Sequence, residues 1–110
     1  MPRILVGGFG AIEALGFQQI LDEVGFDVAV RKSDELVMEI AEPLPDGIIL
    51  NLDTEDGLRM AQHIASMYPA LTMVLCSPER AVMRVYPRFH HGESYVSRLT
   101  PALLVQAMSS

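Results

Sequence analysis

The chain is organised around one segment, Pro45-Asp46-Gly47-Ile48-Ile49-Leu50-Asn51-Leu52-Asp53. It holds a short apolar run, broken only by Asn51, between a Pro-Asp-Gly turn signal and a second polar segment. Such a run is typical of a strand buried on both faces of a parallel sheet. Because ligands of open parallel sheets bind beyond the carboxyl ends of the strands, Asn51 occupies a position at which a functional side chain is expected.

The chain on either side of this stretch alternates between apolar runs and segments with helical spacing. The apolar runs predict five strands, at residues 3–6, 28–30, 48–52, 71–76 and 95–99. Helical spacing, N-cap residues and terminal Gly or Pro predict five helices, at residues 11–24, 33–42, 54–68, 77–89 and 100–108. We therefore expect one α/β domain, residues 1–110, a three-layer sandwich with a five-stranded parallel sheet and helices on both faces.

Composition limits the classes of function. No apolar run reaches the roughly 18 residues that a membrane helix needs. The single cysteine, Cys76, fits a reducing cytoplasm. The net charge of -6 argues against binding to nucleic acid. We therefore expect a cytoplasmic protein that contacts neither membranes nor nucleic acid directly.

The charge is distributed unevenly along the chain. Residues 1–58 contain twelve acids and three bases, a net charge of -9, whereas residues 59–110 contain two acids and five arginines, a net charge of +3. Such asymmetry either guides association through complementary patches or reflects solvated faces with no partner.

Four segments together resemble the receiver domain of bacterial response regulators. They are Arg3-Ile4-Leu5-Val6, residues 45–52, Asp56-Gly57-Leu58 and Gly92-Glu93-Ser94-Tyr95-Val96-Ser97-Arg98. The resemblance covers nearly the whole chain. It implies a flavodoxin-like fold with strand order 2-1-3-4-5.

The resemblance places each chemical position of a receiver on a residue that lacks the required group. Asn51 stands at the phosphoacceptor position, and a neutral amide is no nucleophile for phosphorus. The metal-binding acids correspond to Gly8 and Phe9, or to Gly7 if the register slips by one, and none of these side chains supplies an oxygen ligand. Cys76, followed by Ser77, stands at the switch position, and Arg98 at that of the lysine.

The resemblance therefore implies a pseudo-receiver with a degenerate pocket at Gly8, Phe9, Asn51, Cys76 and Arg98. No metal, cofactor or enzymatic activity is expected. Asp53 is either a displaced acceptor or a loop acid near the start of a helix. Gly8-Phe9-Gly10 is also similar to a dinucleotide-binding turn, but Glu13 falls on the third glycine of that motif and opposes a pyrophosphate. A plain backbone turn is the simpler interpretation.

The expected function is phosphorylation-independent signalling, in transcriptional regulation, by a domain that dimerises or binds a partner protein. By the resemblance, this contact uses the surface of the expected fourth helix, the 95–99 strand and the last helix, with Arg80, Arg84, Arg88 and Tyr95. The chain is then interpretable as the N-terminal part of a longer DNA-binding regulator. The alternative is a small-molecule sensor that uses the altered pocket, with Phe9 either leaving or filling the space there.

Overall fold

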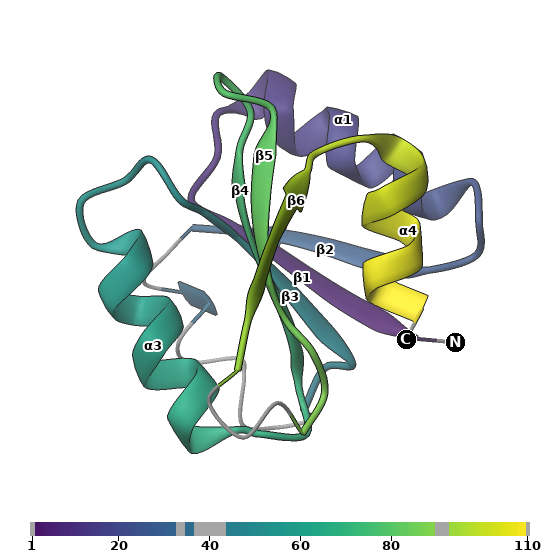
Figure 1. The fold of residues 1–110 in the computed structure, drawn as a ribbon. Helices are drawn as coiled ribbons and strands as arrows, with labels where there is room; N and C mark the ends of the chain where they lie inside the picture. The colour runs from purple at the N-terminus through teal and green to yellow at the C-terminus, as the bar shows by residue number, and fades with distance from the viewer. Residues whose placement is uncertain (1, 33–34, 37–43, 90–92, 110) are drawn as a thin grey trace.

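The computed structural model describes residues 2–32, 35–36, 44–89 and 93–109. The described elements, drawn in Figure 1, follow one another along the chain. They are β1 (Arg3–Gly7), α1 (Ala11–Asp22), β2 (Asp27–Arg31), β3 (Gly47–Asn51), α3 (Gly57–Met67), β4 (Thr72–Ser77), β5 (Val82–Tyr86), β6 (Tyr95–Arg98) and α4 (Pro101–Ser109). No helix in these ranges is long and apolar enough to cross a membrane.

One mixed sheet of six strands organises the molecule, in the order β2-β1-β3-β4-β5-β6. The first four strands of this order run parallel. β5 then runs antiparallel to β4, and β6 antiparallel to β5. Helices α1 and α4 cover one face of the sheet and α3 covers the other, so that the molecule has three layers (Figure 1).

The core consists of two apolar layers, one on each face of the sheet. Successive residues of a strand point to opposite faces, which explains why the central strands are apolar at nearly every position. In β3, Ile49 packs toward α1 and α4, whereas Ile48 and Leu50 pack toward α3. The same alternation continues in β4, where Val74 and Cys76 join the first layer and Met73 and Leu75 the second.

The expectation of a five-stranded parallel sheet with five helices is wrong, because residues 77–89 do not form a helix. Residues 78–81 form a turn after β4, in which Ala81 has a φ of 53°. The chain then returns as β5, paired from Ser77 with Val82 to Met73 with Tyr86. Val82 and Val85, three residues apart, fit one face of a helix, but apolar and polar residues also alternate along this segment as in a strand. The structure follows the alternation, since Met83 and Val85 are buried whereas Arg84 is half-buried.

Because residues 82–86 form an additional strand, the strand that was expected to be the fifth and last has a different position in the sheet. Residues Tyr95–Arg98 do form a strand, but it is the sixth, and it pairs antiparallel with β5 and not parallel with β4. The expected helix at residues 33–42 lies mostly outside the described residues. Its described Leu36 is fully buried on the α3 face.

The orientation of β5 can be tested with one pair of methionine variants. A helix at 77–89 with its stripe on Val82 and Val85 would expose Met83, whereas the strand leaves it 1% exposed. We expect Met83→Ala to lower the free energy of unfolding by about 2–4 kcal/mol, because it leaves a cavity in the core. The matched control is Met67→Ala in α3, where Met67 is 56% exposed. Chemical denaturation measures the free energy of unfolding of both variants. Equally small losses in the two would contradict the burial of Met83 in a strand.

Candidate functional site

Asn51 lies at the carboxyl end of β3, beside the end of β1, and both polar atoms of its side chain form a hydrogen bond. The amide Nδ2 donates to the carbonyl oxygen of Gly8 at 2.9 Å, and Oδ1 accepts the backbone N–H of Asp53 at 2.9 Å. The second bond closes an Asx-type turn after the strand. Gly8 has a φ of 85°, which favours glycine. Asn51 therefore joins two loops, and an aspartate there would have no proton to offer Gly8.

The loop after β3 is also held tightly to the end of its strand. The Thr54 hydroxyl donates to the carbonyl oxygen of Asn51 at 3.2 Å. Gly57, the first residue of α3, lies so close to the same carbonyl that a Cβ atom on it would overlap the oxygen. The start of α3 thus packs directly on the strand end, and a glycine is required there because of this close approach.

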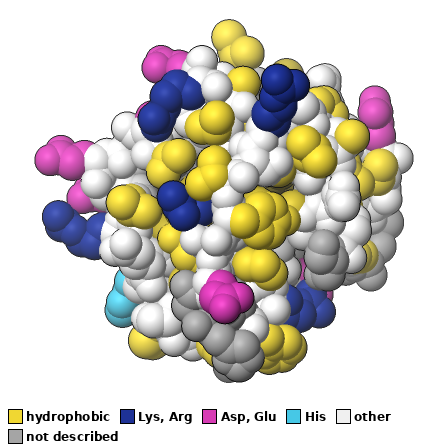
Figure 2. All heavy atoms as spheres, in the orientation of Figure 1, with side chains coloured by type: hydrophobic (Ala, Val, Ile, Leu, Met, Phe, Trp, Pro, Cys, Tyr) yellow, Lys and Arg dark blue, Asp and Glu magenta, His cyan; other side chains and the backbone are white. Residues whose placement is uncertain are grey.

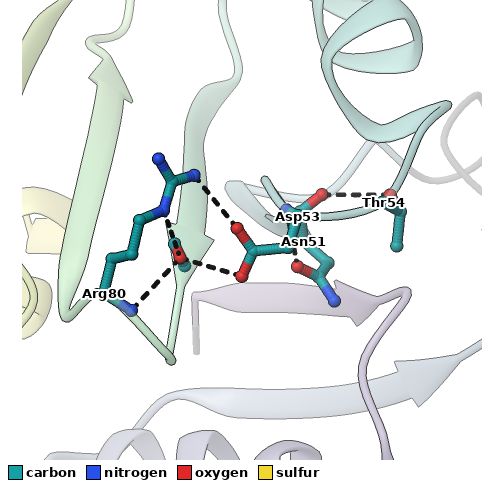
Figure 3. Close-up of polar contacts among 5 residues, drawn as sticks. Asn51, Asp53, Thr54 and Arg80 are labelled. Atoms are coloured by element: carbon teal, nitrogen blue, oxygen red, sulfur yellow. Dashed lines mark hydrogen bonds and ion pairs between the residues drawn. The ribbon is translucent and has the colours of Figure 1, made fainter.

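Asp53, two residues after Asn51, forms a polar cluster with Ser77 and Arg80 (Figure 3). The Ser77 hydroxyl donates to Asp53 Oδ2 at 2.8 Å, and Arg80 Nη2 donates to Oδ1 at 3.1 Å. Arg80 also donates to the Ser77 oxygen from its backbone N–H at 3.4 Å and from Nε at 3.3 Å. The cluster ties the loop after β3 to the β4–β5 turn.

This cluster gives Asp53 a structural role. The ion pair is partly exposed, 28% for the Asp53 side chain and 64% for Arg80, and such pairs contribute at most about 1 kcal/mol. Both carboxylate oxygens of Asp53 are occupied by donors from this chain. That Asp53 is a displaced phosphoacceptor stays a prediction.

Cys76 is paired with Asn51 across β3 and β4, but its thiol belongs to the core. It is fully buried, and burial raises the pKa of the thiol to about 12, because the thiolate is poorly solvated there. The group is therefore a protonated, apolar thiol at neutral pH and not a nucleophile.

The side chains of the two other residues of the expected pocket have different surroundings. The Phe9 ring packs against Phe17 of α1, with 4.7 Å between ring centroids, and so joins the core on the α1 and α4 face. Arg98 lies on β6, three strands away from β3, and its side chain is exposed. Of the five residues, the structure thus brings together Gly8, Asn51 and the buried Cys76, packs the Phe9 ring against Phe17, and places Arg98 three strands away.

A hollow of about 170 Å³ lies beside Asn51, and Phe9 does not fill it. Its lining comes from the ends of β1 and β3 and from the start of α3: Gly7, Gly8, Leu50, Asn51, Thr54, Glu55, Asp56, Gly57 and Met60. Pockets for cofactors and drug-sized ligands usually measure about 300–1,000 Å³. No group of three or more His, Cys, Asp or Glu side chains in the described part of the chain is placed to hold a metal ion.

The residues expected at a partner surface lie around β5 and β6. Arg84 lies on β5 and donates to the Ser94 hydroxyl at 3.0 Å; Arg88 follows β5 and is exposed; Tyr95 begins β6 and is 49% exposed. Arg80 instead lies in the β4–β5 turn, where it pairs with Asp53. The surface is therefore an edge of the sheet and not a helix–strand–helix face.

The sequence did not single out Ser77 as a partner of Asp53, because the two residues are 24 positions apart and meet only through the pairing of β3 with β4. The only local signal was the Ser-Pro-Glu-Arg turn pattern, which also suits a helix start. Comparison with protein-family models and with curated proteins finds no match for this chain.

The role of the Asn51 amide can be tested by Asn51→Asp. We expect a loss of about 1–3 kcal/mol in the free energy of unfolding, because a carboxylate faces the Gly8 carbonyl oxygen without a donor. Gln62→Glu on the exposed surface of α3 makes the same change of amide to carboxylate and should leave stability almost unchanged. Urea titrations of the two variants measure this free energy. An Asn51→Asp protein as stable as the wild type would contradict the proposed role of the amide.

The burial of Cys76 predicts its reactivity. An aromatic disulfide reagent should leave the folded protein unlabelled at mildly alkaline pH, because the thiol is inaccessible and its pKa is near 12. The same reagent in denaturant should label one thiol per chain. Rapid labelling of the folded protein, followed by absorbance, would show that Cys76 is accessible.

Proposed function

We propose that this protein is a phosphorylation-independent signalling domain that acts by binding another protein at the β6 edge, defined as Tyr95–Arg98 with the neighbouring Arg84. The observation that carries the proposal is the open edge strand itself. Val96 is 59% exposed and Tyr95 49% exposed, and the described part of the chain places no strand beyond β6. The resemblance to receiver domains supports a role in signalling, including the regulation of transcription.

Open edge strands favour pairing with another chain, because their outer N–H and C=O groups have no partner within the sheet. Recognition by strand addition uses this property, with the main chain providing affinity and alternate side chains providing specificity. Figure 2 shows hydrophobic and basic side chains, with an acidic one among them, on the side of the molecule where β6 lies in front. A contact in this place requires no chemistry at Asn51.

The geometry around Asn51 gives less support to a small-molecule sensor. The Asn51 amide already has a donor and an acceptor from this chain, and the adjacent hollow measures only about 170 Å³. Arg98, a member of the expected pocket, lies at the far edge of the sheet. We therefore place the binding function at the β6 edge.

Phosphotransfer can be tested directly with acetyl phosphate and Mg²⁺, followed by intact-mass measurement. We expect no added phosphoryl group on the wild-type protein or on Asn51→Asp, because Gly8 and Phe9 supply no side-chain ligand for the metal. Modification of Asn51→Asp would show that the metal site is intact. Modification of the wild type that disappears in Asp53→Asn would identify Asp53 as the acceptor and would overturn the proposal.

The binding surface can be tested without knowledge of the partner, by selecting peptides from a random display library on the wild-type protein. We expect most selected peptides to lose binding to Val96→Lys, because a lysine on an edge strand opposes strand addition. The matched control is Ile12→Lys on α1, where Ile12 is 87% exposed. Thermal unfolding should show both variants folded. Peptides that bind Val96→Lys as well as Ile12→Lys would place the binding function elsewhere.

A further inference from the structure

The hydrogen bonds between β5 and β6 show which backbone groups of the edge strand face outward. The N–H of Leu99 donates to the carbonyl of Ala81 at 2.8 Å, which makes these two residues a hydrogen-bonded pair. Bonded pairs alternate along antiparallel strands, so Ser97 and Tyr95 also bond toward β5. The N–H and C=O groups of Val96 and Arg98 therefore point away from the sheet.

These outward groups are nearly unoccupied within the described residues. The Arg98 carbonyl oxygen accepts a hydrogen bond only from the neighbouring Ser97 hydroxyl, at 3.3 Å. An extended segment placed beside β6 would thus find donors and acceptors at two positions, Val96 and Arg98. This is the spacing with which one strand adds to another.

The side chains of Val96 and Arg98 share one face of the edge. In the register of the sheet Val96 lies opposite Arg84, and Arg98 opposite Val82. Met83 and Val85 point to the other face, into the core beneath α1 and α4. An added strand would therefore meet an exposed apolar side chain and, two residues along on the same face, a guanidinium.

The charge of this face indicates the chemistry of its partner. Arg98 is exposed and forms no ion pair with any residue that the structure describes, and Arg84 bonds to the neutral Ser94 hydroxyl. None of the residues Tyr95–Arg98 is acidic. A second copy of β6 paired with the first would bring four arginines together without a carboxylate among the paired residues. Charge complementarity favours an acidic partner over a second copy.

We propose that the β6 edge binds an extended acidic segment of a partner protein as an additional strand. The inference rests on the function proposed above and names its partner chemistry. Because alternate residues of a strand share a face, the segment carries an apolar residue opposite Val96 and an acidic residue two positions away, opposite Arg98. In the free protein the same arginine discourages edge-to-edge aggregation, so that one side chain both protects the edge and selects its partner.

A capped peptide of sequence Thr-Glu-Thr-Val-Thr-Glu-Thr tests the inference, because it presents the same pattern in both strand directions. Its control is Thr-Lys-Thr-Val-Thr-Lys-Thr. We expect the glutamate peptide to bind, with amide chemical-shift changes centred on Val96 and Arg98, and the lysine peptide not to bind. Added salt should weaken the complex, because its charged pairs are exposed to solvent.

The Arg98→Glu variant should bind the glutamate peptide with an affinity at least about fivefold lower than that of the wild type. The same variant should bind the lysine peptide instead. The matched control is Arg59→Glu on the exposed surface of α3, which should bind as the wild type does. Equal binding of the two peptides, or shift changes away from β6, would overturn the inference. Dimers that strengthen with salt and disappear in Val96→Lys would overturn it in favour of a second copy. Display peptides that depend on Val96 but carry no acid would also overturn it, while leaving the proposed function in place.

Discussion

The short turn of residues 78–81 determines how the C-terminal half of the sheet is arranged. Only these four residues separate Ser77 from its partner Val82, whereas a crossover to a parallel strand needs about a dozen. The chain must therefore reverse, and β5 runs antiparallel to β4. β6 is then displaced outward by one strand, to the edge of the sheet. A short connection in the middle of the chain thus decides which surface of the molecule remains open.

The polar contacts at the carboxyl ends of β3 and β4 stabilise this arrangement. The Asn51 amide joins the loops after β1 and β3, and Asp53 accepts hydrogen bonds from both Ser77 and Arg80 in the turn. The groups beside Asn51 bond to one another and leave a hollow of about 170 Å³ next to it. The end of the sheet where the degenerate receiver pocket was expected therefore acts as a structural junction, and it supports the hairpin that carries the edge strand.

The same reversal changes the role of the C-terminal arginines. If β6 had paired directly with β4, Arg98 would lie at the end of the strand next to Cys76, close to the pocket of Asn51. With β5 between them, Arg98 lies three strands from β3 and faces solvent beside Val96. Its charge then acts on whatever approaches the sheet edge. Part of the positive charge of residues 59–110 therefore lies at the sheet edge.

Local sequence patterns were sufficient to predict the first four strands and the helices after β1, β3 and β6, because apolar runs and capping residues are local signals. The absence of a carboxylate at Asn51 is likewise visible in the sequence alone. For residues 77–89 the spacing of Val82 and Val85 favoured a helix, and that prediction is wrong, because the alternating burial around Met83 belongs to a strand. Only tertiary structure settled this choice, because the preference for a strand depends on the neighbouring strand and on burial. For the same reason, the meeting of Asp53 with Ser77 and the exposure of Arg98 at the sheet edge were decided by strand pairing, which no local pattern encodes.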